Sequence, residues 1–488
     1  MLFNSIEFLI FFPIVTILYY NIDYKYRWFL LLIASCIFYM AFIPQYILIL
    51  FFTILIDYFA GILIEDTNKK EIKKKYLIIS IISTCIVLFI FKYFNFFNSN
   101  FSYIANFFNL NYPIPMLNII LPIGLSFHTF QSLSYVIEVY RGNQKAERNF
   151  GIYSLYVMFY PQLVAGPIER PQNLLHQFYE KHDFNYKDIT DGLKLMAWGA
   201  FKKIVIADKI SQIINPVYEN PTNYTGLSLI VSTFLFSYQI YCDFSGYSDI
   251  ARGSAQVMGF RLMKNFNKPY FSKSISEFWT RWHISLSTWF KDYLYIPLGG
   301  NKVSKSRWIL NLFLTFLISG LWHGANWTYI IWGALNGFYL SSSIITINIR
   351  NKLLELFKID KFHKIHNFFR VFITFSLISF SWIFFRAESI EDSFYIISHL
   401  FKDWDNNFNI YSYIRTLDSD LGKSKIFICI LLILFLEFIH IVQEKKGSIR
   451  DIISQKPTLF RWAIYYIFMF VFLFLGEFNS TDFIYFNF

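Results

Sequence analysis

The chain has 488 residues, of which 55% are apolar and only 16% are charged, and its formal net charge is +11. Soluble domains carry about 25% charged residues, whereas this chain contains many uncharged runs that are long enough to span a bilayer. The composition therefore excludes an ordinary soluble protein and predicts an all-α polytopic membrane protein. The Lys and Arg residues lie in short loops between apolar runs, as they do in cytoplasmic loops, so the charge does not indicate nucleic-acid binding.

The N-terminal part of the chain is predicted to form a series of membrane spans. Apolar runs near 5–20, 28–43, 46–64, 76–97 and 116–138 predict the first five. The loop at 65–76 carries five Lys residues and should face the cytoplasm, which puts the N-terminus outside. The first 20 residues lack the features of a signal peptide, so we interpret them as an uncleaved helix.

Later runs near 370–385, 426–443 and 459–476 bring the expected total to about twelve crossings, with both termini outside. We find no internal repeat and no linker, so we predict one membrane-embedded domain over residues 1–488. The four Cys residues, at 36, 85, 242 and 429, show no CxxC spacing and predict neither a disulfide framework nor a metal site.

The segment from 153 to 172 is expected to be irregular. It contains FYPQLVAGPIERPQ, and its three Pro residues prevent one regular helix. We predict a broken or re-entrant segment over 153–166, which must be buried in protein or line a cavity. Gln131 and Gln162 are polar candidates for lining such a cavity, whereas a structural role is expected for His128.

Two charged features interrupt the next runs. The run near 191–210 contains Lys202 and Lys203 and is an uncertain span. The cleaner run near 226–242 leads into DFSGYSDIARG, where Asp243 and Asp249 resemble a pair of catalytic carboxylates. The Ser and Gly residues between them favour helix capping and a turn instead.

The most informative stretch runs from Glu277 to Gly333, because it holds seven of the twelve Trp residues and two His residues that each follow a Trp. Residues 277–295 are too polar to span the membrane, and Trp279, Trp282 and His283 lie on two neighbouring stripes of one helix. We predict an amphipathic helix at the cytoplasmic interface.

His323 is the strongest catalytic candidate. It lies sixteen residues after Arg307, so a helix would carry it about 24 Å from the basic loop and into the membrane. An ionisable side chain at that depth is costly and indicates function, although a structural hydrogen bond inside a helix bundle is the alternative. A buried neutral imidazole suits a general base that takes a proton from an alcohol. Trp322 and Asn326 are the neighbouring donors in sequence.

Several motifs together resemble the membrane-bound O-acyltransferase family, in the bacterial branch that includes the alginate O-acetylation membrane protein. They are LPIGLSFHTFQSLSYVIEVYRG, FYPQLVAGPIERP, DFSGYSDIARG, EFWTRWHISLSTWFKDYLYIPLGG, GLWHGANWTYIIWGALNG and the ending FIYFNF. The resemblance implies a ring of helices around a funnel and tunnel. It also implies that His323, in the WHG motif, is catalytic and that His283, in the RWHIS motif, is its companion.

The resemblance further implies an inner-membrane O-acetyltransferase, with acetyl-CoA as the expected donor and no tightly bound cofactor. The expected acceptor is an extracytoplasmic polysaccharide, either an alginate-like exopolymer or peptidoglycan, and an extracytoplasmic acetyltransferase is the expected partner besides membrane lipid. Transfer of D-alanine to teichoic acid from a carrier protein is an alternative. A transporter whose buried His relays protons is an alternative of a different class.

Overall fold

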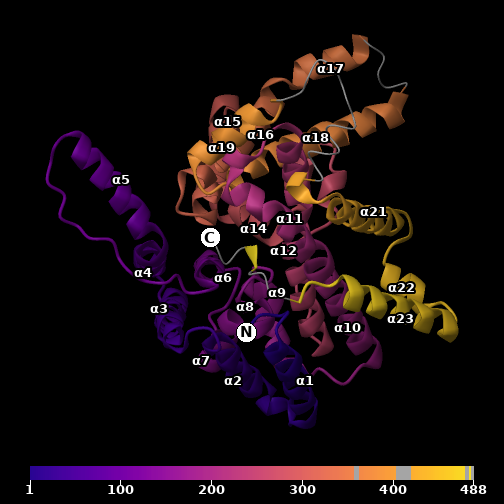
Figure 1. Cartoon of the computed structure of the whole chain (residues 1–488). Helices are drawn as coiled ribbons and strands as arrows, with labels where there is room; N and C mark the ends of the chain where they lie inside the picture. The colour runs from indigo at the N-terminus through magenta and orange to yellow at the C-terminus, as the bar shows by residue number, and fades with distance from the viewer. Residues whose placement is uncertain (357–361, 403–418, 479–482, 485–488) are drawn as a thin grey trace. The chain divides into compact units, whose positions relative to one another are not determined.

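The computed structural model describes residues 1–356, 362–402, 419–478 and 483–484, and every regular element within these ranges is a helix (Figure 1). The chain divides into two compact units. The first comprises residues 1–196 and 248–264, and the second comprises 197–247 and 265–488. The predicted all-α class is confirmed, whereas the prediction of a single domain over 1–488 stays a prediction.

The first unit is built from the N-terminal helices. The elements are α1 (Ile6–Asn21), α2 (Arg27–Met40), α3 (Ile47–Asp66), α4 (Lys70–Leu88), α5 (Phe94–Phe107), α6 (Leu125–Arg141), α7 (Phe150–Met158), α8 (Tyr160–Leu163), α9 (Pro171–Leu174) and most of α10 (Tyr186–Ala200). α3, α4 and α6 contact one another. A π-helical turn, η3 (Phe89–Tyr93), joins α4 to α5.

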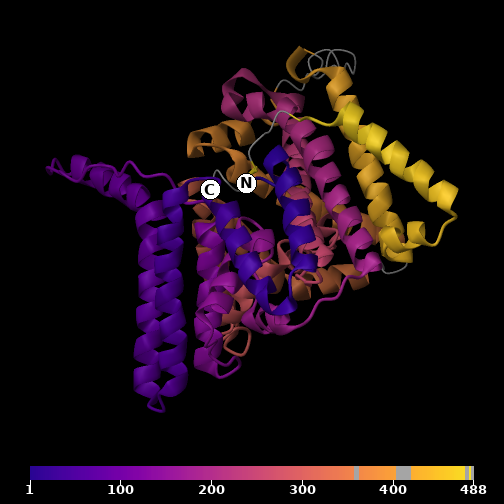
Figure 2. The ribbon, with the colours of Figure 1, turned by 90° about the horizontal axis from the view of Figure 1, so that it is seen from below.

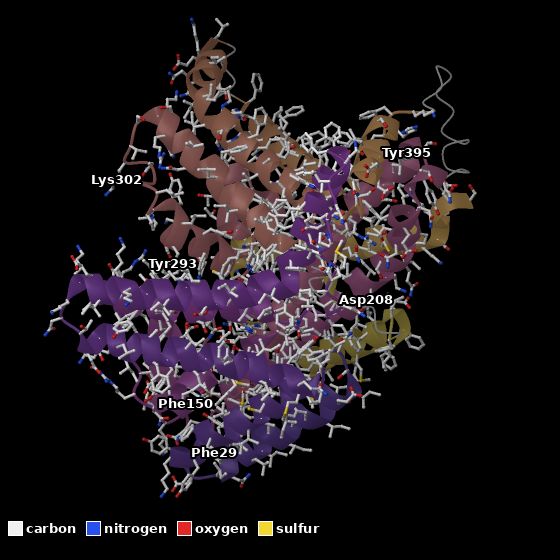
Figure 3. The ribbon with its side chains drawn as sticks, turned by 90° about the vertical axis from the view of Figure 1, so that its left-hand side faces the viewer. Phe29, Phe150, Asp208, Tyr293, Lys302 and Tyr395 are labelled. Atoms are coloured by element: carbon white, nitrogen blue, oxygen red, sulfur yellow. The ribbon has the colours of Figure 1, made fainter. Side chains whose placement is uncertain are left out.

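The second unit contains the remaining helices. They are α11 (Asp208–Glu219), most of α12 (Gly226–Val257), α13 (Ile275–Arg281), α14 (Ile284–Phe290), α15 (Lys305–His323), α16 (Trp327–Ile345), α17 (Ile347–Leu356), α18 (His363–Arg386), α19 (Ile390–His399), α21 (Lys423–Lys446), α22 (Ile449–Ser454) and α23 (Thr458–Leu475). Lys302 lies in the exposed turn before α15, with its side chain directed outward (Figure 3).

Six helices among the described residues are long and apolar enough to cross a membrane, or seven if the bent pair α16 and α17 forms one span. They include α3, α12, α18, α21 and α23, together with the continuous helical run from α4 to α5. The polytopic class is therefore confirmed. The total of about twelve crossings, which counts shorter helices such as α1, stays a prediction, as does the funnel.

The segment at 153–166 is broken, as its Pro residues predict. α7 ends at Met158, α8 is a single turn that begins at Tyr160, and no helix follows until Pro171. The whole segment is buried, and the Tyr160 N–H donates to the hydroxyl of Ser35 at 3.0 Å. Side-chain acceptors of this kind satisfy backbone groups that an irregular segment leaves without helical partners.

Two predicted boundaries are wrong. DFSGYSDIARG forms no turn, because it lies inside α12, an uninterrupted helix of 32 residues. Its small residues serve close packing, since a Cβ on Gly246 would lie 2.7 Å from the carbonyl oxygen of Gly199. The expected helix over 277–295 is also interrupted. It is divided at Trp282 and His283 into α13 and α14, and a π-helical turn, η8 (Lys291–Tyr295), follows.

Candidate active site

His283 lies at this interruption in a strained backbone conformation. Its φ is 40° and its ψ is 56°, and it is one of three non-Gly residues with positive φ in the described ranges. The following turn is fixed by Asn265, whose carbonyl accepts from the Ile284 N–H at 2.9 Å and whose side chain accepts from the Ser285 N–H at 3.2 Å. Left-handed backbone in a residue with a Cβ is costly and is typical of functional sites.

The His283 imidazole is buried among aromatic rings. Phe244 of α12 meets it edge to face, with ring centroids 4.6 Å apart, and Phe266 stacks on it at 6.4 Å. Burial lowers the pKa of His283 to about 3. The ring is therefore neutral at physiological pH, the state in which one nitrogen of an imidazole can accept a proton.

His323 is the last residue of α15, and it is buried. α15 and α16 approach closely there because Gly320 and Gly333 face each other, and a Cβ on Gly320 would lie 2.3 Å from the Tyr329 carbonyl oxygen. The imidazole packs against Trp332 at 4.9 Å and Phe385 at 5.3 Å. The close packing of the two helices thus sets the position of the His323 ring.

A chain of aromatic rings in contact with one another connects the two imidazoles. Phe266, which stacks on His283, meets Trp282 at 5.0 Å, and Trp282 meets Trp382 of α18 at 5.1 Å. Trp382 stacks on Trp332 at 5.8 Å, and Trp332 contacts His323. We call Phe244, Phe266, Trp282, Trp332, Trp382 and Phe385 the aromatic cluster. It brings the two His residues, forty positions apart in sequence, into one continuous apolar environment.

The other predicted site residues occupy different surroundings. Trp279 packs on Trp332 of the aromatic cluster, with ring centroids 5.7 Å apart, and Trp322 contacts the His323 ring at 4.9 Å. Asn326 caps α16, because its side chain accepts from the Thr328 N–H at 3.0 Å and donates to the Glu388 carbonyl at 3.0 Å. Both the oxygen and the nitrogen of the Asn326 side-chain amide are therefore engaged in these two hydrogen bonds.

Gln131 and Gln162 belong to the first unit, where both side-chain amides donate to the carbonyl oxygen of Tyr156. Their assignment as tunnel-lining residues stays a prediction. His128 lies three residues before Gln131 and is 2% exposed. Neither nitrogen of its ring has a hydrogen-bond partner among the described residues.

Sequence reasoning missed a buried charged cluster in the second unit. Lys203 pairs with Asp208 and with Asp243, each at 2.7 Å, and all three side chains are at most 4% exposed. The second Asp243 oxygen accepts from the Ile484 N–H at 2.8 Å. The two adjacent Lys residues in an apolar run, Lys202 and Lys203, could have indicated this cluster, because a buried charge requires a partner of opposite charge. Asp243 is thus one half of an ion pair and not a capping residue.

These features define a helical membrane protein whose second unit buries two imidazoles, one of them neutral by burial, in an aromatic environment. Neutral imidazole accepts a proton from an alcohol, and a dry environment strengthens any donor that faces a developing oxyanion. The arrangement therefore suits proton abstraction from a hydroxyl that attacks an acyl group.

Comparison with known proteins agrees with this chemistry. The profile of the membrane-bound O-acyltransferase family (MBOAT) matches residues 149–387, which include both His residues. The chain is 39% identical over 407 residues to the probable alginate O-acetylase AlgI of Pseudomonas aeruginosa, covering 82% of this chain and 75% of that protein. It is 35% identical over 394 residues to the peptidoglycan O-acetyltransferase of Helicobacter pylori, covering 75% and 72%.

A more distant relative is the teichoic acid D-alanyltransferase of Bacillus subtilis, which is 27% identical over 286 residues, covering 56% of this chain and 71% of that protein. The chain belongs to the membrane-bound O-acyltransferase family, and it is a membrane O-acyltransferase.

Proposed function

We propose that the protein moves acetyl groups from a cytoplasmic donor, acetyl-CoA, across the membrane for O-acetylation of the hydroxyl groups of an extracytoplasmic polysaccharide. The observation that carries this proposal is the pair of buried His residues within one aromatic cluster. The identities support acetyl over D-alanyl transfer, because they are 39% and 35% to the two O-acetylating relatives and 27% to the D-alanyltransferase. The acceptor is an alginate-like polymer or peptidoglycan, and a partner protein outside the membrane completes the transfer.

His323 acts as the general base in this proposal. Its imidazole takes the proton of an acceptor hydroxyl while the oxygen forms a bond to the acyl carbon. The bond from that carbon to the thiol sulfur of the donor then breaks, and the departing thiolate takes the proton. The rings around His323 exclude water, which would otherwise hydrolyse the acyl group. His283 is the companion residue and acts on the side of the donor.

The His323→Gln variant tests this assignment. It should abolish O-acetylation while the protein remains folded in the membrane, because Gln keeps a polar side chain but cannot act as a base at neutral pH. Mass spectrometry of the polysaccharide fraction at matched protein levels measures the outcome. Unchanged O-acetyl content would refute the role of His323 as the base.

The two His residues should differ in steady-state kinetics. With purified protein, acetyl-CoA and an acceptor mimic, we expect His323→Ala to show no turnover at any donor concentration. His283→Ala should retain turnover that grows with donor concentration. His283→Asn is the matched variant, because Asn tolerates left-handed backbone and removes only the imidazole. If both positions are equally inactive at saturating donor, the two residues act as one catalytic unit.

The nature of the acyl group is tested separately. We expect purified protein to consume acetyl-CoA, and the product ester to have the mass of acetate. Turnover with a D-alanyl carrier protein and none with acetyl-CoA would replace the proposed reaction with D-alanylation. Membrane fractionation of the bacterial source should locate the protein in the cytoplasmic membrane.

A further inference from the structure

The helical run from α4 to α5 is too long for one membrane crossing. It covers 38 residues, from Lys70 to Phe107. A straight helix of that length would measure about 57 Å, nearly twice the hydrocarbon thickness of about 30 Å. From Tyr76, after the last Lys of the turn, to the end of η3 at Tyr93 the run has 18 residues, or about 27 Å, and this part matches the thickness. α5 must therefore lie beyond the end of the span.

The structure has a bend at this point. α3 and α4 lie side by side, and α5 runs off at the end of α4, away from the direction that both helices share (Figure 1, Figure 2). The π-helical turn η3 lies at the junction, and such turns are a recognised cause of kinks. α5 is thus directed across the end of the span and does not extend it.

One face of α5 is occupied by the chain that follows it. The Asn95 side chain exchanges two hydrogen bonds of 2.8 Å with the backbone of Leu117. The Asn98 amide donates to the Pro115 carbonyl at 3.1 Å and accepts from the Tyr112 hydroxyl at 2.7 Å. The extended return segment, residues 108–121, thereby gains hydrogen-bond partners that do not depend on water.

The opposite face of α5 is apolar and exposed. Phe97, Phe101 and Ile104 lie on it, and their exposed fractions are 36%, 55% and 50%. This face adjoins the exposed surface of the preceding helical run, because Phe97 stacks on Phe89, which is 41% exposed, with ring centroids 5.7 Å apart. Bulky apolar side chains that stay exposed in the folded protein fit a hydrocarbon environment, and here they adjoin the surface of a membrane span.

The segment carries no charge, which fits lipid as the occupant of this face. From position 93 to position 137 the chain contains no Asp, Glu, Lys or Arg. An uncharged amphipathic helix rich in Phe and Tyr suits the boundary between headgroups and acyl chains, where aromatic side chains are enriched.

We propose that α5 and the return segment, residues 94–121, form an interfacial flap that inserts its Phe97, Phe101 and Ile104 face among the lipids at the end of α4 opposite the Lys-rich turn. The flap lies parallel to the membrane plane. Its side chains Asn95 and Asn98 keep the return segment hydrogen-bonded to α5 at that depth, where backbone groups without hydrogen-bond partners would cost free energy. Ser99, on the other side of the helix, faces water.

The proposal is tested by depth-dependent quenching, which needs no enzymatic activity. The four native Cys residues are replaced, and single Cys residues are introduced at Phe97, Phe101, Ile104 and Ser99. Each is labelled with an environment-sensitive fluorophore in lipid nanodiscs. With quencher attached near the headgroup, we expect positions 97, 101 and 104 to be quenched equally, and by at least about twofold more than position 99.

Three results would overturn the proposal. If position 101 is as weakly quenched as position 99, the flap lies in water. If quenching by deep and shallow probes changes steadily from 97 to 104, the helix crosses the membrane and does not lie along it. If the label at position 101 is exposed to water in nanodiscs but protected from water in native membranes, a protein partner covers this face. Unchanged thermal unfolding of each variant provides the control for folding.

Discussion

The contact between α15 and α16 predicts a large effect from adding one methyl group at Gly320. A Cβ there would lie 2.3 Å from the Tyr329 carbonyl oxygen, whereas ordinary contacts begin at 3.4 Å. The obstacle is backbone, so a side-chain rotation cannot relieve it and the helices must separate by about 1 Å. His323 lies three residues further along α15 and packs on α16. Misplacement by about 1 Å can lower an enzymatic rate about 100-fold.

We therefore expect Gly320→Ala to lower O-acetylation about 100-fold while the protein remains in the membrane. Gly337→Ala is the matched control on the same helix pair. Its added Cβ would meet Phe313 at 3.1 Å, which needs a shift of only a few tenths of an ångström. The assay compares O-acetyl content at equal protein levels, with thermal unfolding of both variants. If Gly320→Ala is as active as Gly337→Ala, the helix contact does not set the position of His323.

Three further predictions concern charge and topology. Single Cys residues at positions 72 and 106 should react with impermeant reagents from the cytoplasm and from outside, respectively, and the same side for both would contradict the expected orientation. Lys203→Met should destabilise the protein by about 3–5 kcal/mol, since it removes the buried cation that Asp208 and Asp243 share. Unfolding of the variant in detergent solution at the same temperature as wild type would contradict this. Burial raises the pKa of Glu169 to about 7, so its contribution to stability is complete below pH 4.5 and falls as the pH rises to about 7. Glu169→Gln should remove this dependence and unfold at a higher temperature than wild type at about pH 8, and an unchanged pH profile would contradict the shift.

The sequence predicted those features that depend on local patterns. The apolar run after Arg307 predicted the helix that carries His323, and three Pro residues predicted the interruption between α7 and α10. The sequence also predicted the membrane class and contained the WHG and RWHIS motifs with their two His residues.

Features that depend on tertiary contacts were not predictable in this way. The stripe of apolar residues through α13 and α14 fits one helix, yet the chain breaks at His283 because Asn265 and Phe244, distant in sequence, hold it there. The Lys203 cluster joins residues from η5 (Phe201–Ala207), α11 and α12. Small residues near Asp243 suggested a turn, although they permit close helix packing instead.

The discontinuous first unit has a consequence for how the protein is made. Its last part, residues 248–264, emerges from the ribosome only after the 51 residues from 197 to 247, which belong to the other unit. At about 5–20 residues per second, the unit waits about 3–10 s for its final segment. Until then the sites that receive this segment, such as the Tyr20 hydroxyl that bonds to the Val257 carbonyl, stay open. During biogenesis there is thus an interval in which the N-terminal helices of the first unit have been synthesised but their packing cannot yet be completed. Membrane chaperones can bind the incompletely packed unit during this interval.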